Sequence, residues 1–152
     1  MLKDTMQTLN MHFKRAETAY RAIMSWEDIS VNILENYDKI MVVDSFIFRL
    51  IKIQDLMGDK LFKNLLKAIE EYKEEMSVLD ILDKLEKLSI IDDANQWVEF
   101  RKIRNILTHE YPFNEEEMIN GLKSGLTAFI DIKNIYFKII KYIEKKKLIK
   151  NS

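Results

Sequence analysis

The sequence predicts an all-α fold, an up-and-down bundle of about five to six helices. Apolar residues recur at steps of three and four along almost the whole chain, the spacing of a buried stripe on an amphipathic helix. Of the 152 residues, only 3 are glycine and 1 is proline. Because both are common in turns and costly inside helices, their scarcity disfavours a hairpin-rich β fold. Hydrophobic residues make up 47% and charged residues 32%, a globular composition.

Two helices are expected in the N-terminal part of the chain. The apolar stripe of the first consists of Met6, Leu9, Phe13, Ala16, Tyr20 and Ile23. Its end stays open, because Ser25-x-x-Asp28 fits both a capping box and a mid-helix position. The stripe of the second consists of Ile40, Val43, Ile47, Leu50 and Ile51. Gly58 is expected to end this helix as a C-terminal cap, and Asp59 to cap the next one.

The remaining helices are predicted from their caps. Asp59 would begin a third helix, with the stripe Leu61, Leu65, Ala68, Ile69 and Tyr72. Ser77-x-x-Asp80 resembles a capping box for a short fourth helix, which carries Leu82, Leu85 and Leu88. Asp92 or Asp93 would open a fifth helix with Phe100, Ile103 and Leu107. It should stop by Tyr111, because Pro112 disfavours helical geometry in the residue before it.

A long last helix is expected from Asn114-x-x-Glu117, where three consecutive glutamates suit a helix N-terminus. Its stripe consists of Leu122, Leu126, Phe129, Tyr136, Ile140 and Ile143. With no linker or repeat, residues 1–152 are predicted to form one domain, whose ends (1–4 and 147–152) are the parts expected to fray. The default explanation of the lysine-rich C-terminal run 138–150 is that lysines at a helix C-terminus complement the helix dipole.

Composition excludes several classes of protein. Cysteine is absent, which rules out disulfides, zinc–thiolate sites and cysteine nucleophiles. With only 2 histidines, no metal centre and no cofactor are predicted. No apolar run reaches 18 residues and the N-terminus lacks a signal-peptide pattern, so we expect a cytoplasmic protein without a membrane span. The net charge of −1 means that any contact with nucleic acid must be local.

The chemically loaded segment is Phe100 to Pro112, with the sequence FRKIRNILTHEYP. On a helical wheel, polar residues at steps of three and four share a side of the helix away from its apolar face; they are Arg101, Arg104, Asn105 and Thr108. His109 follows Arg104 by five residues, roughly 140° away on an ideal helix. The two side chains would therefore meet at one atom only if the helix frays after Thr108, or if two copies of the chain pool them across a two-fold axis.

The stretch Arg104-Asn105-x-x-x-His109-x-Tyr111, late in a small helical chain, resembles the Arg-x4-6-His signature of HEPN domains. It is most similar to the Arg-x4-His-x-Tyr form of HepT-like proteins, the toxin partners of MNT-type minimal nucleotidyltransferases. The resemblance implies a HEPN-like fold and a homodimer that acts as a metal-independent endoribonuclease. The expected substrate is RNA, and the expected product is a 2′,3′-cyclic phosphate.

The resemblance also implies a role for each residue. His109 would act as general acid or base, which suits an imidazole pKa near 6.5. Arg104 would hold the scissile phosphate, and Asn105 would orient either the phosphate or the imidazole. Thr108 and Arg101 are expected to support substrate binding, and Arg101 fits a plain surface charge equally well. In HepT-like families the motif tyrosine, here Tyr111, accepts AMP groups from the cognate nucleotidyltransferase antitoxin. Negative charge at that position would repel RNA.

Three other interpretations stay open. A related helical family serves as the non-catalytic, substrate- or nucleotide-binding subunit of nucleotidyltransferases and carries a similar Arg-Asn-x-x-x-His-x-Tyr stretch. A second alternative is that the chain is a plain interaction module. A third is that the motif is only a polar helix end, in which Arg104 pairs with a nearby carboxylate. His12 is predicted to lie at the edge of the first helix's apolar stripe. Asp44 and Arg49 fit ordinary solvation better than support of the cleft or of a partner surface.

Overall fold

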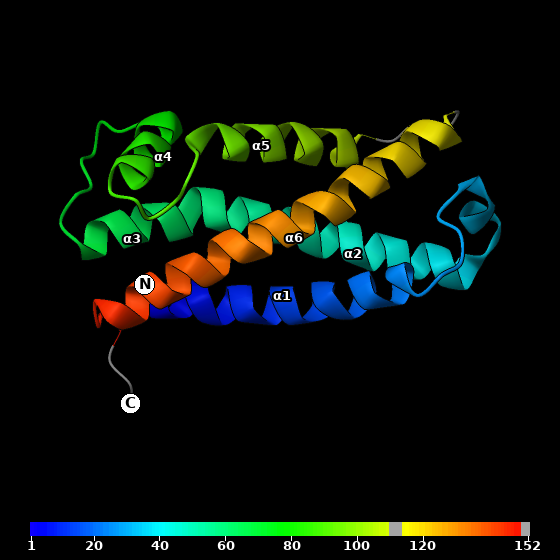
Figure 1. Ribbon diagram of the computed structural model, residues 1–152, viewed down its shortest axis with the longest axis horizontal. Coiled ribbons are helices and arrows are strands. Elements are labelled where there is room, and N and C mark those ends of the chain that lie inside the picture. Colours follow the sequence, from blue (N-terminus) through cyan, green and yellow to red (C-terminus); the bar gives the residue numbers. More distant parts are fainter. Residues whose placement is uncertain (110–113, 150–152) are drawn as a thin grey trace.

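The computed structural model describes residues 1–109 and 114–149, which form a bundle of helices with no strand among them. Three long helices run along the molecule, α1 (Leu2–Met24), α2 (Tyr37–Leu56) and α6 (Glu115–Lys145). Figure 1 shows α5 (Ala94–Thr108) along the edge away from α1, with α6 crossing between them. The short α3 (Phe62–Ala68) and α4 (Val78–Lys87) lie at one end. The predicted helical bundle is confirmed.

The second and third predicted helices are continuous, so the prediction that Gly58 ends one helix and Asp59 caps the next is wrong. Between α2 and α3 lies η2 (Met57–Leu61), a wider helical turn in which the Phe62 N–H donates to the Met57 carbonyl five residues back. Gly58 has no positive φ angle, the conformation that a glycine cap uses. The backbone N–H and C=O groups that a helix break would have left unpaired are instead hydrogen-bonded within one continuous helical rod.

The caps that the sequence predicts from local spacing are present. In α4 the Ser77 hydroxyl accepts from the Asp80 N–H at 3.1 Å, and the Asp80 carboxylate accepts from the Ser77 N–H at 2.9 Å. The Asn114 side chain accepts from the Glu117 N–H at 3.1 Å and begins α6. Asp93, one of the two candidates, caps α5 by accepting from the Asn95 N–H.

The connection between α1 and α2 resolves the open end of the first helix. Helix α1 ends at Met24 with Ser25 as its C-terminal cap, so Ser25 does not begin a new helix. A short 3₁₀ helix, η1 (Val31–Glu35), follows, and the Asn36 side chain then caps α2 by accepting from the Lys39 N–H at 3.1 Å. At the chain ends, α1 already begins at Leu2 and α6 ends at Lys145.

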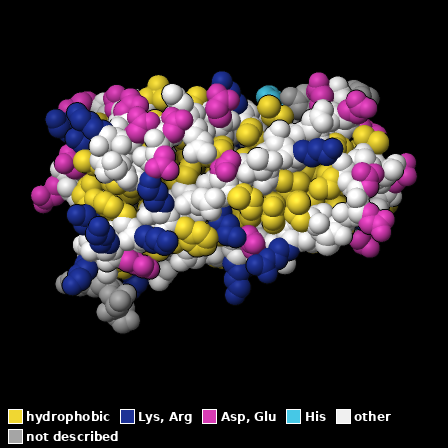
Figure 2. Space-filling model, viewed as in Figure 1, with side chains coloured by type: hydrophobic (Ala, Val, Ile, Leu, Met, Phe, Trp, Pro, Cys, Tyr) yellow, Lys and Arg dark blue, Asp and Glu magenta, His cyan; other side chains and the backbone are white. Residues whose placement is uncertain are grey.

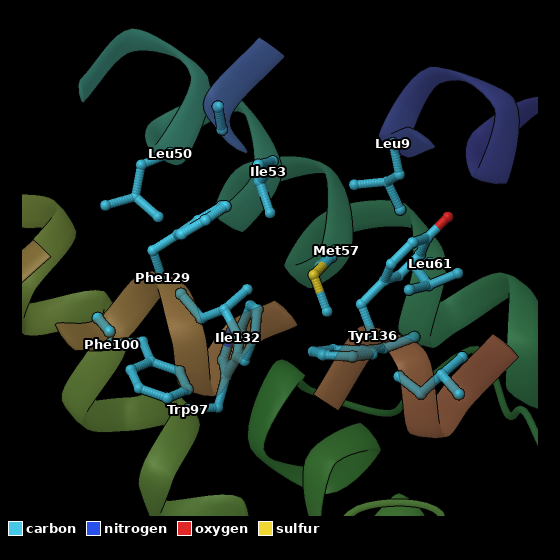
Figure 3. Packing of buried hydrophobic residues seen from close by; sticks show 14 of the residues in the cluster. Leu9, Leu50, Ile53, Met57, Leu61, Trp97, Phe100, Phe129, Ile132 and Tyr136 are labelled. Carbon is cyan, nitrogen blue, oxygen red and sulfur yellow. The ribbon is translucent and has the colours of Figure 1, made fainter. Parts of the chain in front are cut away.

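The core lies along the inner face of α6. Figure 3 shows Phe129 and Ile132 of α6 between α2 and α5. Phe129 is completely buried and meets Phe46 of α2 edge to face, with ring centroids 5.6 Å apart. Farther along α6, Tyr136 stacks on Phe13 of α1 at 4.6 Å. Its hydroxyl donates to the Asn10 side chain at 2.6 Å, and burial raises the pKa of Tyr136 above its ordinary value.

Two glycines let the end of α5 pack closely against α6. A Cβ atom at Gly125 would lie 3.3 Å from both Leu107 of α5 and Leu50 of α2. At Gly121 it would lie 3.4 Å from Ile106 and 3.6 Å from Leu107. The absence of side chains at these two positions therefore lets the last turn of α5 lie close to α6. None of the described helices is both long enough and apolar enough to span a membrane.

Candidate functional site

The described part of the predicted motif, Arg104 to His109, lies in the last turns of α5 and at the residue that follows it. Buried Trp97 and Phe100 fix this helix to the core, at 2% and 4% exposure. Trp97 meets Phe62 of α3 edge to face at 4.8 Å, which holds its ring in place. Arg101 and Asn105 are exposed on the outer side of the helix. The amphipathic pattern of α5 thus places the polar residues of the motif on its solvent side, as the wheel predicts.

Arg104 is held by a carboxylate from α2. Its Nε and Nη2 atoms donate to the two oxygens of Asp55, both at 2.9 Å, a planar two-bond pair. The pair is partly open to water, with 33% of the Arg104 side chain and 41% of the Asp55 side chain exposed. The hydrogen bond to Asp55 raises the pKa of Arg104 above its ordinary value. The guanidinium therefore stays charged and has a fixed orientation.

This pair leaves Arg104 able to bind a ligand. An arginine side chain carries five N–H donors. The two bonds to Asp55 leave the other N–H groups free of the described residues. Arg104 also lines a polar pocket of about 270 Å³ between α2, η2 and α5. The other polar residues of this pocket are Gln54, Asp55, Asp59, Arg101 and Asn105.

His109 lies where the chain leaves α5. Its φ and ψ angles of −80° and 137° are extended, and its N–H donates to the Ile106 carbonyl at 3.2 Å. The side chain is exposed and lines a second, mainly apolar pocket of about 100 Å³ between α2, α5 and α6. Asp44 and Glu117 line the same pocket, so two carboxylate residues share this pocket with the imidazole.

Within one chain, the two predicted catalytic residues open on different pockets. The pocket lined by Arg104 and the pocket lined by His109 have no lining residue in common. The helix does end after Thr108, yet this does not bring both side chains to one cavity. The two side chains therefore line separate pockets within one chain, as a site pooled from two copies of the chain requires.

The other motif residues differ in their placement. Arg101 and Asn105 line the polar pocket beside Arg104. The Thr108 hydroxyl donates to the Asn105 carbonyl at 2.9 Å, a bond within the last turn of α5, and Thr108 lines neither pocket. Tyr111, the predicted acceptor of AMP, lies outside the described residues. The structure thus groups Arg101, Arg104 and Asn105 and separates them from His109.

Two site residues were not predicted from the sequence. Asp55 and Gln54 lie about fifty residues before the motif, and no local spacing pairs them with α5. The Gln54 amide nitrogen donates to the Phe100 carbonyl at 3.1 Å, while its Oε1 atom is buried without a partner among the described residues. A sequence signal does exist, since Gln54 is a polar residue beside the apolar stripe of α2.

His12, Asp44 and Arg49 also have defined environments. His12 is only 9% exposed, and its Nδ1 atom lies 3.0 Å from Arg49 Nη1, which must be the donor of this bond. Burial, followed by the charges of Arg49, Lys52 and Arg15, lowers the pKa of His12 below its ordinary value. Arg49 thus binds α1, while Asp44 is exposed beside the His109 pocket.

Charge is unevenly distributed around the site. Figure 2 shows mainly acidic side chains at the right-hand end of the visible face, where α6 begins and where α1 connects to α2 in Figure 1. The first turn of α6 contributes Glu115, Glu116 and Glu117. Local positive charge near the motif comes from Arg101 and Lys102 of α5, because Asp55 offsets the charge of Arg104. Between residues 1 and 109 and between 114 and 149, no group of three acidic or histidine side chains could hold a metal ion.

No protein-family model matches this chain, and no curated protein or solved structure is found to be similar to it. The HEPN resemblance therefore stays a prediction from the motif, placed on a helical architecture that is shown.

Proposed function

We propose that this chain is a metal-independent endoribonuclease of the HEPN type, a HepT-like toxin that works as a homodimer. The observation that carries the proposal is the geometry at the end of α5. There, an exposed His109 closely follows an Arg104 that Asp55 orients and leaves able to donate. An imidazole and a pre-oriented guanidinium are the two groups that phosphodiester transesterification needs.

The proposed reaction is attack of a ribose 2′-oxygen on the neighbouring phosphorus. The 2′-hydroxyl gives its proton to the imidazole of His109 as the new P–O bond forms. The bond from phosphorus to the 5′-oxygen breaks, and that oxygen takes a proton from water and leaves as a hydroxyl. The free N–H groups of Arg104 stabilise the charge on the phosphate oxygens, and Asn105 orients the same group. The products are a 2′,3′-cyclic phosphate and a free 5′-hydroxyl.

A homodimer would bring the two groups together. Since Arg104 and His109 open on different pockets in one chain, a composite site needs His109 from a second copy. Exposed apolar side chains near His109 support such an interface: Ile106 is 43% exposed and Met118 is 43% exposed. On α2, Met41 and Phe48 are also exposed and lie within about 40° of each other on the helical wheel.

The regulatory partner of the proposed toxin is an MNT-type nucleotidyltransferase acting in the cytoplasm. It would transfer AMP to the hydroxyl of Tyr111, two residues after His109 in the motif, and so add a negatively charged phosphate there. Repulsion between this phosphate and the RNA backbone would stop cleavage. This part of the proposal depends on the motif resemblance alone.

A second candidate function is the non-catalytic, nucleotide-binding subunit of a nucleotidyltransferase. Two observations favour it. Asp55 offsets the charge of Arg104, and carboxylates of Asp44 and Glu117 lie around the His109 pocket. Such surroundings weaken long-range attraction of RNA, whereas a small ligand in the polar pocket needs no such field. Expression separates the two functions, since a nuclease toxin is expected to stop cell growth and a binding subunit is not.

The direct test is cleavage of total tRNA and of a structured mRNA in EDTA. We expect the wild-type chain to cut and to leave 2′,3′-cyclic ends, and His109→Ala to be slower by about 10²-fold or more. Arg21→Ala is the matched control, because Arg21 is an exposed cation on α1 that pairs with Glu17 and lines neither pocket. Cleavage by His109→Ala at the wild-type rate would overturn the catalytic assignment. An inactive wild-type chain would favour the binding subunit.

Mixing two inactive variants tests the composite site. Dimers formed at random from Arg104→Ala and His109→Ala chains include heterodimers in which one composite site has both residues intact. The mixture is therefore expected to recover about one quarter of the wild-type rate. If both residues acted from the same chain, no heterodimer would hold an intact site, and the mixture would stay inactive.

A further inference from the structure

The second half of α6 is positively charged. Residues 131–149 include six lysines and two acidic residues, whereas the first turn of α6 holds three glutamates. Stabilisation by the helix dipole is confined to the last turn, so it accounts for Lys145 but not for Lys133 or Lys141. Figure 2 shows lysine and arginine side chains beside hydrophobic ones at the lower left of the visible face, where α6 ends and α1 begins in Figure 1.

A mainly apolar hollow of about 240 Å³ lies in this region, between α1 and α6. Its aromatic lining residues are Phe13 of α1 and Tyr136 and Phe137 of α6. Phe13 and Tyr136 stack on each other with ring centroids 4.6 Å apart, and the Tyr136 hydroxyl donates to the Asn10 side chain. Phe137 differs from them, because 49% of it is exposed. The hollow therefore combines a fixed aromatic pair with one ring that solvent or a ligand can reach.

Lysines from both helices surround the exposed ring. Lys14 of α1 and Lys133 of α6 line the hollow. Lys133 Nζ lies 3.0 Å from a carboxylate oxygen of Glu17 and 5.9 Å from the centroid of the Phe137 ring, so the ion pair holds this ammonium beside the ring. Lys141 is exposed one turn after Phe137, about 40° around α6. Neither Lys14 nor Lys141 forms an ion pair with the described residues.

We propose that this surface binds single-stranded RNA, with one base stacked on Phe137 and the neighbouring phosphates against Lys14, Lys133 and Lys141. Proteins that hold single strands combine these two features, an aromatic ring for the base and cations along the backbone. The exposed Glu144, on the same side of α6 as Phe137, reduces the positive charge without cancelling it, because Lys14 and Lys141 are unpaired within the described chain. A duplex has no free base face to offer to the ring.

The inference rests on the proposed function for the choice of polymer, because the bound strand would be the RNA that the end of α5 cleaves. The hollow is a separate site, since it shares no lining residue with the pockets of Arg104 and His109. A strand held there would raise the local concentration of the rest of the RNA molecule around the protein. An acidic peptide would also be attracted by the lysines, but it has no flat base to stack on Phe137.

Fluorescence anisotropy of the full chain with a labelled, 2′-O-methylated single strand of about 12 nucleotides tests the proposal. The methyl groups block the 2′-oxygens, so the proposed cleavage cannot consume the probe. We expect Phe137→Leu to weaken binding about fivefold or more and Phe137→Trp to preserve it, because only the flat ring stacks. Lys14→Ala and Lys141→Ala should each lower the slope of log K against log salt by about 0.7. Lys123→Ala, exposed on α6 outside the hollow, should bind as the wild type does.

The outcomes separate this inference from the proposed nuclease. Equal binding by Phe137→Leu and the wild type would overturn the stacking surface, as would displacement of the strand by an equal concentration of oligoglutamate, which would indicate an acidic protein partner. Cleavage of RNA in EDTA with either of these results would leave the nuclease standing without the surface. Binding that depends on Phe137 in a chain that never cleaves RNA would support the surface and overturn the nuclease.

Discussion

Removing either partner of the Arg104–Asp55 pair separates a structural role of Arg104 from a functional one. Arg104→Ala and Asp55→Ala break the same two hydrogen bonds, but only the first removes the guanidinium. If Arg104 binds the scissile phosphate, Arg104→Ala should slow RNA cleavage by about 10²- to 10³-fold. Asp55→Ala keeps the charge and loses only its orientation, so we expect a loss of about 3- to 30-fold.

The effect on stability follows from exposure. With 33% and 41% of the two side chains exposed, water screens the pair and hydrates whichever partner remains. Each variant should therefore lose at most about 1 kcal/mol of unfolding free energy. For a domain of this size that lowers the melting temperature by about 2–4 °C. The loss should be similar in both variants.

The assay combines initial cleavage rates with thermal melts followed by circular dichroism, all well below the melting temperature. Equal losses of activity in both variants, with equal losses of stability, would show that Arg104 acts only through the fold. Arg104→Ala that cleaves like the wild type would refute the role in phosphate binding outright.

Three further predictions concern the fold. Phe129→Ala should lower the unfolding free energy in urea by about 3–5 kcal/mol, because the ring is fully buried; a loss below 1 kcal/mol would contradict the packing described. Ser77→Ala removes one half of the capping box of α4 and should lower the unfolding free energy by about 1 kcal/mol in the same assay. A control substitution in the middle of the helix should leave the unfolding free energy unchanged. His12 has a lowered pKa in the fold, so its contribution to stability is complete above pH 6.5 and is lost as the pH falls through the folded pKa. Urea unfolding of the wild type and of His12→Gln from pH 7.5 to 5 should show a difference that shrinks toward acid, and a constant difference would exclude this linkage.

The parts of the fold predicted correctly are those encoded by neighbouring residues. The Ser77–Asp80 box and the Asn114 cap each join groups three residues apart, so the spacing alone predicts the bond. The apolar stripes likewise place Phe129 and Tyr136 in the core. Such features need no knowledge of how the helices pack.

Gly58 was misinterpreted because glycine is more common after a helix than within it. The apolar stripe held a better signal. On a regular helix, Phe62, Leu65 and Leu66 would face about 120°, 60° and 160° away from Leu50 of α2. One extra residue in a wider turn accounts for this shift, whereas a break would have left the two stripes unrelated.

The candidate site was only partly predictable. Arg104 and His109 were expected to point apart on one helix; in the structure they line different pockets, but His109 lies just beyond the end of α5 in an extended conformation. The pairing with Asp55 joins residues 49 positions apart, and the orphaned oxygen of Gln54 depends on the packing of α2 against α5. Such contacts depend on how the helices pack, so no short-range spacing in the sequence predicts them.

The wider turn at Met57–Leu61 also constrains how this chain can change over evolutionary time. Deleting one residue there would restore ordinary helical bonding and so improve the backbone locally. The same deletion would keep Phe46 and Leu50 on the same side as the apolar residues of α3, because the wider turn holds one residue more than a regular helix would. A single-residue deletion within a regular part of α2 would instead turn one apolar stripe about 100° away from the other. Descendants of this chain are therefore expected to vary in length by one residue at this turn more readily than elsewhere in the rod.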